Sequence, residues 1–430
     1  MDRGLGRAPP APKSGLRCVL TGEISNAGST HELLHLSATH AANLDHIHVA
    51  NLWNKLGKQR DASKPSHRVA MQQLLRRTVD LMHSCEARNL SNIAHGLAKC
   101  RLVGLDGDTD ELFAAVAEAA VRGGLGRFKP QELANTAWAF ATAGQREPTL
   151  FDAIATAAAA RSSDFNPQDL ANTAWAFASA GQRAPALFDA IAVAAMPRLR
   201  DFTPQGLTNT AWAFATASHA ALALLDAIAT AAAARLREFN PQDLAITAWA
   251  FATAGQRAPT LFDVIATAAV PRLRDFTPQN LANTAWAFAT AGYAAPALFD
   301  AIAAVAAPRD FDSQNLANTA WAFATASQRA PALFDAIATA SVPRLCEFKP
   351  QELANTAWAF ATAGQQAQTL LDAIATASVP QLRDFSPQSL ANTAWAFATA
   401  GHAAPALFDA IATVAVPRLC GSNPQDLANT

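Results

Sequence analysis

The chain has 430 residues, a formal net charge of −1 and a hydrophobic content of 51%, to which alanine contributes the largest share. No stretch reaches the roughly 18 uninterrupted apolar residues of a membrane span, and five cysteines, an odd number, fit a disulfide framework poorly. Residues 102–430 carry 19 basic against 27 acidic side chains, which argues against strong non-specific binding to nucleic acid, because such binding needs an excess of basic charge.

Residues 1–40 precede any clear repeat. From Arg3 to Gly22 the sequence has four basic residues, no acid and several prolines. Two interpretations stay open, a disordered start and an organelle transit segment.

A short pattern in this first part fits a zinc motif. On a helix, His31-Glu32-Leu33-Leu34-His35 would place two imidazoles on one face with the glutamate as general base, and His40 offers a third ligand. Little chain precedes the pattern and helical repeats follow it, so a protease fold has no room to form around it. Because such a short pattern also arises by chance, we predict neither a metal site nor a catalytic residue.

Residues 41–128 are predicted to hold degenerate helical repeats. The run from Asn89 to Ala98 matches the later repeat, with His95 in place of a tryptophan, and a weaker match surrounds Trp53. Terminal repeats of a stacked array are often atypical because one of their faces meets water.

Residues 129–430 form a regular array of eight full units and a truncated ninth. Successive tryptophans are separated by 37, 37, 37, 37, 35, 37 and 37 residues, each within a near-copy of Ala-Asn-Thr-Ala-Trp-Ala-Phe-Ala: Trp138, Trp175, Trp212, Trp249, Trp286, Trp321, Trp358 and Trp395. A single unit of this size cannot bury its own apolar face and must stack on its neighbours. The period therefore predicts an all-α fold, an α-solenoid of tandem 37-residue two-helix repeats. The sequence stops in mid-motif, from which we expect a fragment of a longer protein.

One repeat illustrates the prediction. Asn166 stands where a helix N-cap belongs, Pro167 takes the first helical position, and Gly181 supplies the left-handed turn that ends the helix. A second helix opens near Pro185, and its Asp189 recurs in every full unit, where an acid near a helix start complements the helix dipole.

The first helix of a repeat has two different faces. Leu170, Ala174 and Phe177 lie at i, i+4 and i+7, and form the predicted buried seam. Gln168, Asn172, Trp175 and Ser179 share another face, a polar and aromatic stripe that repeats in each unit.

The repeat motif resembles a known family. Pro-Gln-Asp/Glu-Leu-Ala-Asn-Thr-Ala-Trp-Ala-Phe-Ala, as at residues 130–141 and 167–178, followed by Leu-Phe-Asp-Ala-Ile, is similar to the octotricopeptide repeats and the helical repeats of FAST-kinase-like and RAP-domain proteins. RNA-editing substrate-binding complex proteins carry a similar array. The resemblance implies binding of single-stranded RNA in RNA processing, stability or translation, in the mitochondrion or, as the alternative, the chloroplast.

Three groups of residues are candidates for RNA binding. The first group lies three residues after the cap and varies between repeats: Glu132, Asp169, Asp243, Asn280, Asn315, Glu352 and Ser389. The second is the asparagine of the stripe, which only Ile246 interrupts: Asn135, Asn172, Asn209, Asn283, Asn318, Asn355 and Asn392. The third lies in the turn after the first helix: Arg146, Arg183, Arg257 and Arg329.

Each candidate has a structural alternative. Helix capping uses the same residue types as the varying position, and the arginines also suit solvated turns. The tryptophans either stack on bases or lie buried between adjacent repeats, and we favour burial.

The sequence shows no nucleophile triad, phosphate-binding glycine loop or paired acids, so we predict no enzyme activity and no cofactor. The predicted partners are single-stranded RNA and other proteins of an RNA-processing complex, without a membrane. The alternative function is a protein-interaction scaffold of the same fold, because helical solenoids serve both purposes.

Overall fold

A computed structural model describes residues 14–102, 104–306 and 310–416. Within these ranges every regular element is a helix, and the α-solenoid prediction is confirmed. The chain divides into two compact units, Met1–Phe202 and Thr203–Thr430, called unit 1 and unit 2 below. None of the described helices is long and apolar enough to span a lipid bilayer.

The helices alternate between two kinds, which we call first helices (odd numbers) and second helices (even numbers). The first helices of unit 1 are α1 (Ser14–Asn26), α3 (His46–Leu56), α5 (Ala87–Cys100), α7 (Pro130–Thr142) and α9 (Pro167–Ser179). Its second helices are α2 (Thr30–Thr39), α4 (Arg68–Asp80), α6 (Asp106–Gly123), α8 (Pro148–Ala159) and α10 (Pro185–Ala195).

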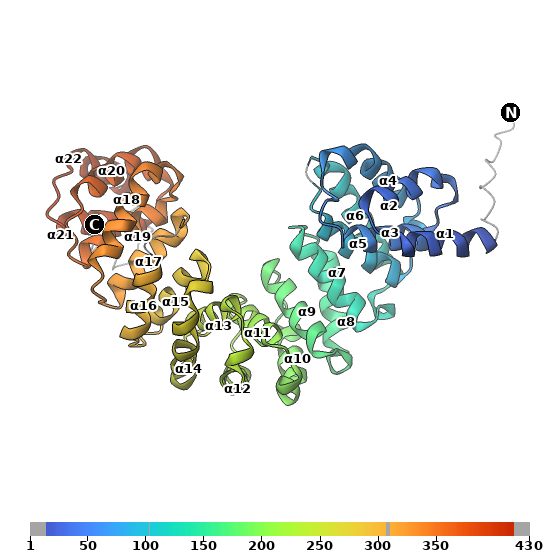
Figure 1. Ribbon diagram of the computed structural model, residues 1–430, viewed down its shortest axis with the longest axis horizontal. Coiled ribbons are helices and arrows are strands. Elements are labelled where there is room, and N and C mark those ends of the chain that lie inside the picture. The colour runs from blue at the N-terminus through green and yellow to red at the C-terminus, as the bar shows by residue number, and fades with distance from the viewer. Residues whose placement is uncertain (1–13, 103, 307–309, 417–430) are drawn as a thin grey trace. The chain divides into compact units, whose positions relative to one another are not determined.

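Unit 2 continues the same alternation (Figure 1). Its first helices are α11 (Pro204–Thr216), α13 (Pro241–Thr253), α15 (Pro278–Thr290), α17 (Ser313–Thr325), α19 (Pro350–Thr362) and α21 (Pro387–Thr399). Its second helices are α12 (Leu222–Ala233), α14 (Pro259–Ala269), α16 (Pro296–Ala306), α18 (Pro331–Ser341), α20 (Gln368–Ser378) and α22 (Pro405–Ala415).

First helices pack on one another in chain order inside each unit. In unit 1, α3 packs on α5, α5 on α7 and α7 on α9, and in unit 2 the row runs from α11 to α21. Second helices pack on one another less closely than first helices do, and each also contacts the first helix of its own repeat. The first helices of a unit therefore form one closely packed layer, which brings equivalent side chains of successive repeats together.

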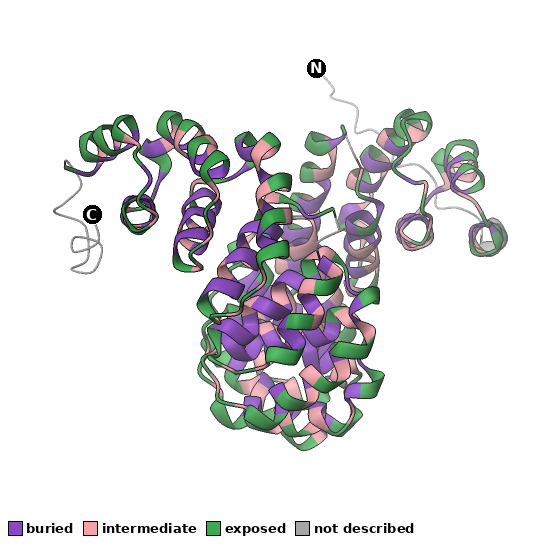
Figure 2. Ribbon diagram, turned by 60° about the vertical axis from the view of Figure 1, so that its left-hand side comes forward, coloured by how far each residue is buried: buried purple, intermediate pink, exposed green. Residues whose placement is uncertain are grey.

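The core lies between the two layers. Leu170, Ala174 and Phe177 are each at most 1% exposed, which confirms the predicted seam. Phe177 meets Phe151 of the preceding second helix edge to face, with ring centroids 5.2 Å apart, a favoured arrangement for aromatic pairs. In Figure 2 buried and exposed residues occupy different faces of the same helices.

Helix starts and stops follow the local chemistry of the sequence. The Asn166 side chain accepts a hydrogen bond from the Asp169 N–H at 2.8 Å, as an N-cap residue does. Gly181 has φ of 64° after α9, a left-handed conformation that glycine adopts without strain. Ser218 and Ser327 take the same conformation, at φ of 51° and 53°.

An arginine after the second helix joins several repeats to the preceding repeat. Proline ends several second helices, and the chain continues as a 3-10 helix such as η6 (Met196–Asp201) or η8 (Val270–Asp275). The Arg198 guanidinium in η6 donates a 2.8 Å hydrogen bond to the carbonyl of Phe165, 33 residues earlier. Equivalent bonds join Arg161 to Phe128, Arg272 to Phe239 and Arg344 to Phe311.

Two helices lie in the first part of the chain, for which a disordered start and a transit segment were left open. Residues 14–39, expected to be disordered or a transit segment, contain α1 and α2. Leu20 and Ile24 lie one helical turn apart and are 1% and 0% exposed, and Leu33 is also fully buried. The four-residue spacing of Leu20 and Ile24 is typical of an amphipathic helix. The sequence analysis missed this helix because the segment has no repeat motif. Residues 1–13 lie outside the described ranges, as does the truncated ninth repeat after residue 416.

The degenerate repeats of residues 41–128 form two helix pairs, α3 with α4 and α5 with α6. Gly96 of α5 lies so close to α3 that an added Cβ would be 2.2 Å from the Trp53 carbonyl oxygen. Trp53 is fully buried, and its indole N–H donates to Thr78 Oγ1 at 2.9 Å. These repeats therefore keep the layered packing without the repeat motif.

Candidate functional site

The polar and aromatic stripe predicted from the sequence lies on the surface of the first helices. On α19, Gln351 is exposed, and Asn355 and Trp358 are half-buried. The same pattern holds on each first helix from α7 to α21, except that Ile246 takes the asparagine position on α13. Within each unit, close packing of the first helices places the separate stripes side by side on one face, called the first-helix face below.

Tryptophan side chains of successive repeats form a ladder along this face in unit 2. Ring centroids are 6.2, 6.3, 6.4 and 6.2 Å apart, with interplanar angles between 28° and 31°, for the pairs Trp249–Trp286, Trp286–Trp321, Trp321–Trp358 and Trp358–Trp395. The indoles thus lie between adjacent repeats, as burial predicts, and still keep part of their surface exposed. Stacking on bases remains a prediction.

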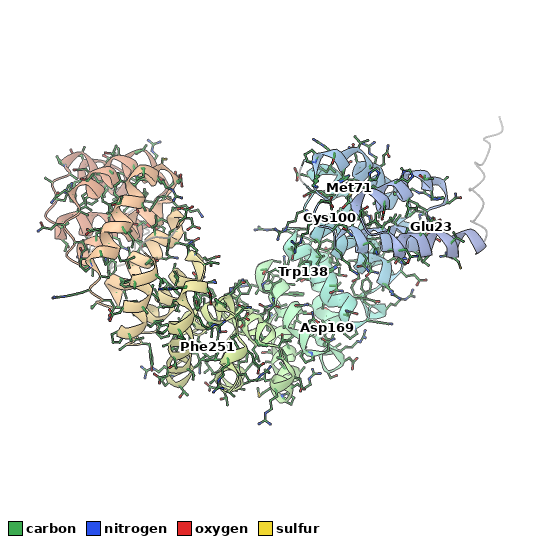
Figure 3. All side chains as sticks on the ribbon, viewed as in Figure 1. Glu23, Met71, Cys100, Trp138, Asp169 and Phe251 are labelled. Carbon is green, nitrogen blue, oxygen red and sulfur yellow. The ribbon has the colours of Figure 1, made fainter. Side chains whose placement is uncertain are left out.

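The ladder has a shorter counterpart in unit 1. His95 of α5 packs against Trp138 of α7, with ring centroids 5.1 Å apart, and Trp138 is labelled in Figure 3. Burial, aided by Lys99 and Lys58, lowers the pKa of His95 to about 4. At neutral pH the imidazole is therefore uncharged and serves as an aromatic substitute for tryptophan.

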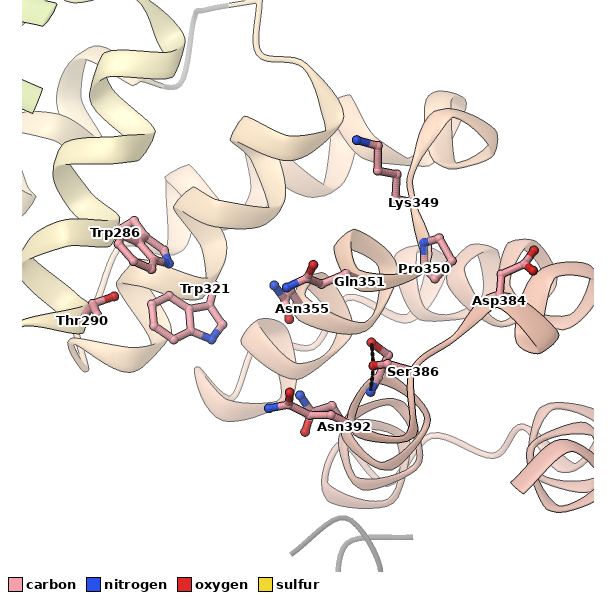
Figure 4. A pocket seen from close by; sticks show the side chains of 12 residues that line it. Trp286, Thr290, Trp321, Lys349, Pro350, Gln351, Asn355, Asp384, Ser386 and Asn392 are labelled. Atoms are coloured by element: carbon pink, nitrogen blue, oxygen red, sulfur yellow. Dashed lines mark hydrogen bonds between the residues drawn. The ribbon is translucent and has the colours of Figure 1, made fainter. Parts of the chain in front are cut away.

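A cleft of about 600 Å³ opens on the first-helix face of unit 2. Trp286 and Trp321 line one side, and the carboxamides of Gln351 and Asn355 point toward them from α19 (Figure 4). Lys349 stands at the opposite edge. Three further lining residues belong to the start and middle of α21: Ser386, Gln388 and Asn392.

The cleft combines flat apolar rings with neutral hydrogen-bonding groups. Each carboxamide offers donors and an acceptor, and an indole offers a stacking surface. The charged lining residues are Lys349 and Asp384, one of each sign. The site therefore suits a flat, polar and weakly charged ligand group such as a nucleobase.

The varying position three residues after the cap is buried in most repeats. Exposed fractions are 5–8% for Asp169, Asp243, Asn280, Asn315, Glu352 and Ser389, whereas Glu132 is half-buried. Of this group only Ser389 lines the cleft. Burial leaves these side chains little surface with which to meet a base edge, and base readout by them stays an untested prediction.

The N-cap residue and the residue three positions after it vary together between repeats, and the sequence analysis missed this. Lysine occurs with glutamate, asparagine with aspartate, threonine with glycine or asparagine, aspartate with asparagine, and serine with serine: Lys129–Glu132, Lys349–Glu352, Asn166–Asp169, Asn240–Asp243, Thr203–Gly206, Thr277–Asn280, Asp312–Asn315 and Ser386–Ser389. No pair joins two acids. Comparing the two positions together across the repeats would have revealed this pairing in the sequence.

Hydrogen bonds account for the two lysine–glutamate pairs and for Asn240–Asp243. Lysine cannot accept a bond from the helix backbone, and in that case the longer glutamate reaches back. Glu132 Oε2 accepts from the Lys129 N–H at 2.9 Å, and Glu352 Oε2 from the Lys349 N–H at 3.0 Å. Where asparagine is the cap, the shorter aspartate suffices, as at Asp243 with the Asn240 N–H at 3.3 Å.

We expect Asp243→Asn to stabilise the protein at neutral pH. Burial raises the pKa of Asp243, as it does for Asp169 (Figure 3), so the folded state binds the proton more tightly than the unfolded state. The ionised carboxylate then costs stability at pH values above its folded pKa, and this cost disappears as pH falls below the unfolded value of about 3.9. Asparagine already occupies the equivalent positions 280 and 315.

The measurement is the thermal midpoint of Asp243→Asn and the unmodified protein across a series of acidic to neutral pH values. The advantage of the variant should shrink toward the acidic end. Asp409→Asn, at an exposed position of α22, is the matched control. A variant that is less stable than the unmodified protein at neutral pH contradicts the prediction.

The turns after the first helices hold two more sets of side chains. Arg146, Arg183, Arg257 and Arg329 are exposed there, at the opposite helix end from Lys129 and Lys349. They flank the first-helix face without lining the cleft.

The residue that follows the glycine at the end of a first helix bonds to the recurring aspartate of the preceding second helix. Gln256 donates to Asp226 at 2.6 Å, His402 lies 2.9 Å from Asp372, and the Tyr293 hydroxyl donates to Asp263. The aspartate therefore ties adjacent repeats together, a role that helix-dipole reasoning alone did not predict.

The sequence of the chain matches a known protein family. Residues 30–304 match the family described as RNA-editing substrate-binding complex 6 protein, and residues 160–383 match it in a second, overlapping alignment. The chain belongs to this family. The two matches together extend from the start of α2 to residue 383, shortly after α20, and therefore cover the degenerate repeats and most of the regular ones.

Other comparisons add little to the family assignment. A comparison with curated proteins finds no match. Among solved structures, a chain of a homology model of the full-length AP-3 complex in an intermediate open conformation is 10% identical, with a TM-score of 0.29, over 97% of this chain and 72% of that chain. A similarity of this size carries no argument about fold or function.

The zinc-like pattern lies within the region that matches the RNA-editing substrate-binding complex 6 family. His31 and His35 are exposed on α2 with ring centroids 6.4 Å apart. The Glu32 carboxylate accepts the Gly28 N–H at 2.7 Å, and His40 faces Glu23 at 4.0 Å. Across the described ranges, no group of three or more histidine, cysteine or acidic side chains is arranged to hold a metal ion.

Proposed function

We propose that the chain holds single-stranded RNA along the first-helix face, as a non-catalytic member of a mitochondrial RNA-editing assembly. The observation that carries the proposal is the cleft of about 600 Å³ in which indoles face carboxamides. Membership of the RNA-editing substrate-binding complex 6 family supports the RNA partner and the assembly. Membership of the same family also favours the mitochondrion over the chloroplast.

Each type of side chain in the cleft has a chemical counterpart in an unpaired strand. Exposed indole surface accepts base stacking, and the carboxamides of Gln351 and Asn355 match the donors and acceptors on base edges. The Lys349 ammonium suits a phosphate oxygen. Paired bases in a duplex hide these edges and faces, which is why the ligand is a single strand.

Charge in the cleft predicts how binding responds to salt. Lys349 is balanced by Asp384 in the lining, and the array as a whole is acidic. For single strands, the logarithm of the association constant falls with the logarithm of salt concentration by roughly 0.7 for each neutralised phosphate. We therefore expect a shallow dependence, because stacking and amide contacts supply most of the affinity.

The test is filter binding of the full chain to unstructured single-stranded RNA at several salt concentrations. The triple variant Gln351→Ala, Asn355→Ala and Asn392→Ala removes three carboxamides of the cleft and should weaken binding about tenfold or more. The control is Thr339→Ala, Thr376→Ala and Thr413→Ala, at exposed second-helix positions whose hydroxyls bond only within their own helix.

The result also decides between RNA binding and a protein scaffold. Equal loss in the cleft variant and the control would refute binding through the first-helix face. Failure to retain any RNA near physiological salt would favour the protein scaffold, for which the same array would bind a protein partner directly. Circular dichroism of both variants checks that the helices remain folded.

A further inference from the structure

The exposed part of the cleft repeats without variation. Along α15, α17, α19 and α21 the stripe is the same set of four side chains in the same order: glutamine, asparagine, tryptophan and threonine. The cleft residues that differ between repeats, such as Lys349 and Ser386, stand at the helix caps along one edge. Chemical variety is thus confined to the rim, and the surface that would face bases is uniform.

The spacing of this surface is as regular as its composition. Four consecutive indole pairs have centroid distances within 6.2–6.4 Å and angles within 28–31°. Trp286 and Trp321 are 35 residues apart in sequence rather than 37, yet their centroid distance is 6.3 Å. The shorter repeat therefore keeps the regular step of the ladder.

The cleft is built diagonally across four repeats. Its indoles come from α15 and α17, whereas its carboxamides come from α19 and α21. Each first helix of unit 2 carries a tryptophan and a glutamine at these positions, and all but α13 also carry the asparagine. Shifting a ligand by one repeat along α15 to α21 therefore brings it against the same residue types. A strand satisfies successive positions equally well only if it presents the same chemical groups at each step.

We propose that the preferred ligand is a homopolymeric tract, a run of one nucleotide type in unpaired RNA. This inference rests on the proposed function. Identical sites favour the same base, and for independent sites the preferences multiply. A preference of about threefold at each nucleotide, which a single hydrogen bond supplies, becomes about eightyfold over four repeats.

Ile246 provides a natural interruption of the uniform surface. It is half-buried on α13, between Asn209 on α11 and Asn283 on α15. Its side chain cannot form hydrogen bonds, so the uninterrupted row of asparagine amides in unit 2, called the amide row below, runs only from Asn283 to Asn392. Replacing it with asparagine would extend the row back to Asn209, and the other repeats show that asparagine fits this position.

The experiment measures binding of the full chain to equal-length strands of oligo(A), oligo(C), oligo(U) and a mixed sequence without self-complementarity. One homopolymer should bind at least about tenfold more tightly than the mixed strand. Ile246→Asn should increase that ratio, and Asn318→Ile, which interrupts the row in its middle, should reduce it. Leu222→Asn, at an exposed position of α12, should leave the ratio unchanged.

The possible outcomes separate this inference from the proposed function. If the mixed strand binds as tightly as every homopolymer, the homopolymer preference is overturned while RNA binding stands. If one homopolymer is preferred but neither Ile246→Asn nor Asn318→Ile changes the ratio, the amide row is not its origin and the inference fails. If no strand binds, the proposed function fails and the inference fails with it.

Discussion

Phe288→Ala is expected to lower the free energy of unfolding by about 3–5 kcal/mol, the range for deleting a fully buried phenylalanine. Phe288 is 0% exposed. Its ring meets Phe262 edge to face at 5.0 Å and Tyr293 at 5.8 Å, so the substitution leaves a cavity between the two layers of α15 and its neighbours. Because each repeat is stabilised by stacking on the next, the damage should spread to adjacent repeats.

Urea unfolding followed by circular dichroism measures the loss, and hydrogen exchange shows which helices lose protection. The matched control is Phe408→Ala on α22, where the ring is 36% exposed, and the expected loss is within about 1 kcal/mol. Similar losses in the two variants would mean that the aromatic pairs between layers do not dominate the stability of the array.

Gly96→Ala is expected to destabilise the degenerate repeats of unit 1 by about 1–3 kcal/mol or more, because overpacking against a rigid neighbour cannot be relieved by a side-chain rotation. An added Cβ would lie 2.2 Å from the oxygen and 2.4 Å from the carbon of the Trp53 carbonyl. Both atoms belong to the backbone of α3, so α3 and α5 must move apart. The separation would also disturb the hydrogen bond from Trp53 to Thr78.

Thermal unfolding of Gly96→Ala and Gly107→Ala makes the comparison. Gly107 also lies in a helix of unit 1, α6, and an added Cβ there would meet no atom within 4 Å. The control should change stability by no more than about 0.5 kcal/mol. Equal midpoints for the two variants would show that α3 and α5 are not held in close contact.

Features governed by neighbouring residues were predictable from the sequence. The cap at Asn166, the turn at Gly181 and the seam through Phe177 depend on local hydrogen bonds, backbone conformation and helical spacing, all of which the sequence displays directly. The polar and aromatic stripe followed from the same spacing, and its exposure in the structure agrees with it.

Features that depend on a distant partner were not predictable in the same way. Nothing near Arg198 in the sequence indicates that its guanidinium binds the carbonyl of Phe165, and the partner of Asp226 is likewise a residue of the next repeat. α1 and α2 escaped prediction because they lack the motif that marks the other repeats. At the third helical position, the bonds of Glu132 and Asp243 to the cap N–H were not predicted, and base readout by this position stays an untested prediction.

The hydrogen bonds between repeats affect how the number of repeats can change in evolution. Arg272 binds a carbonyl 33 residues earlier, and Gln256 binds a carboxylate 30 residues earlier, so these bonds join repeats that are neighbours in the chain. Unequal recombination between two near-identical copies would add or remove one whole module and leave the remaining bonds with equivalent partners. The length of the array can therefore change by one repeat at a time without altering how the core packs.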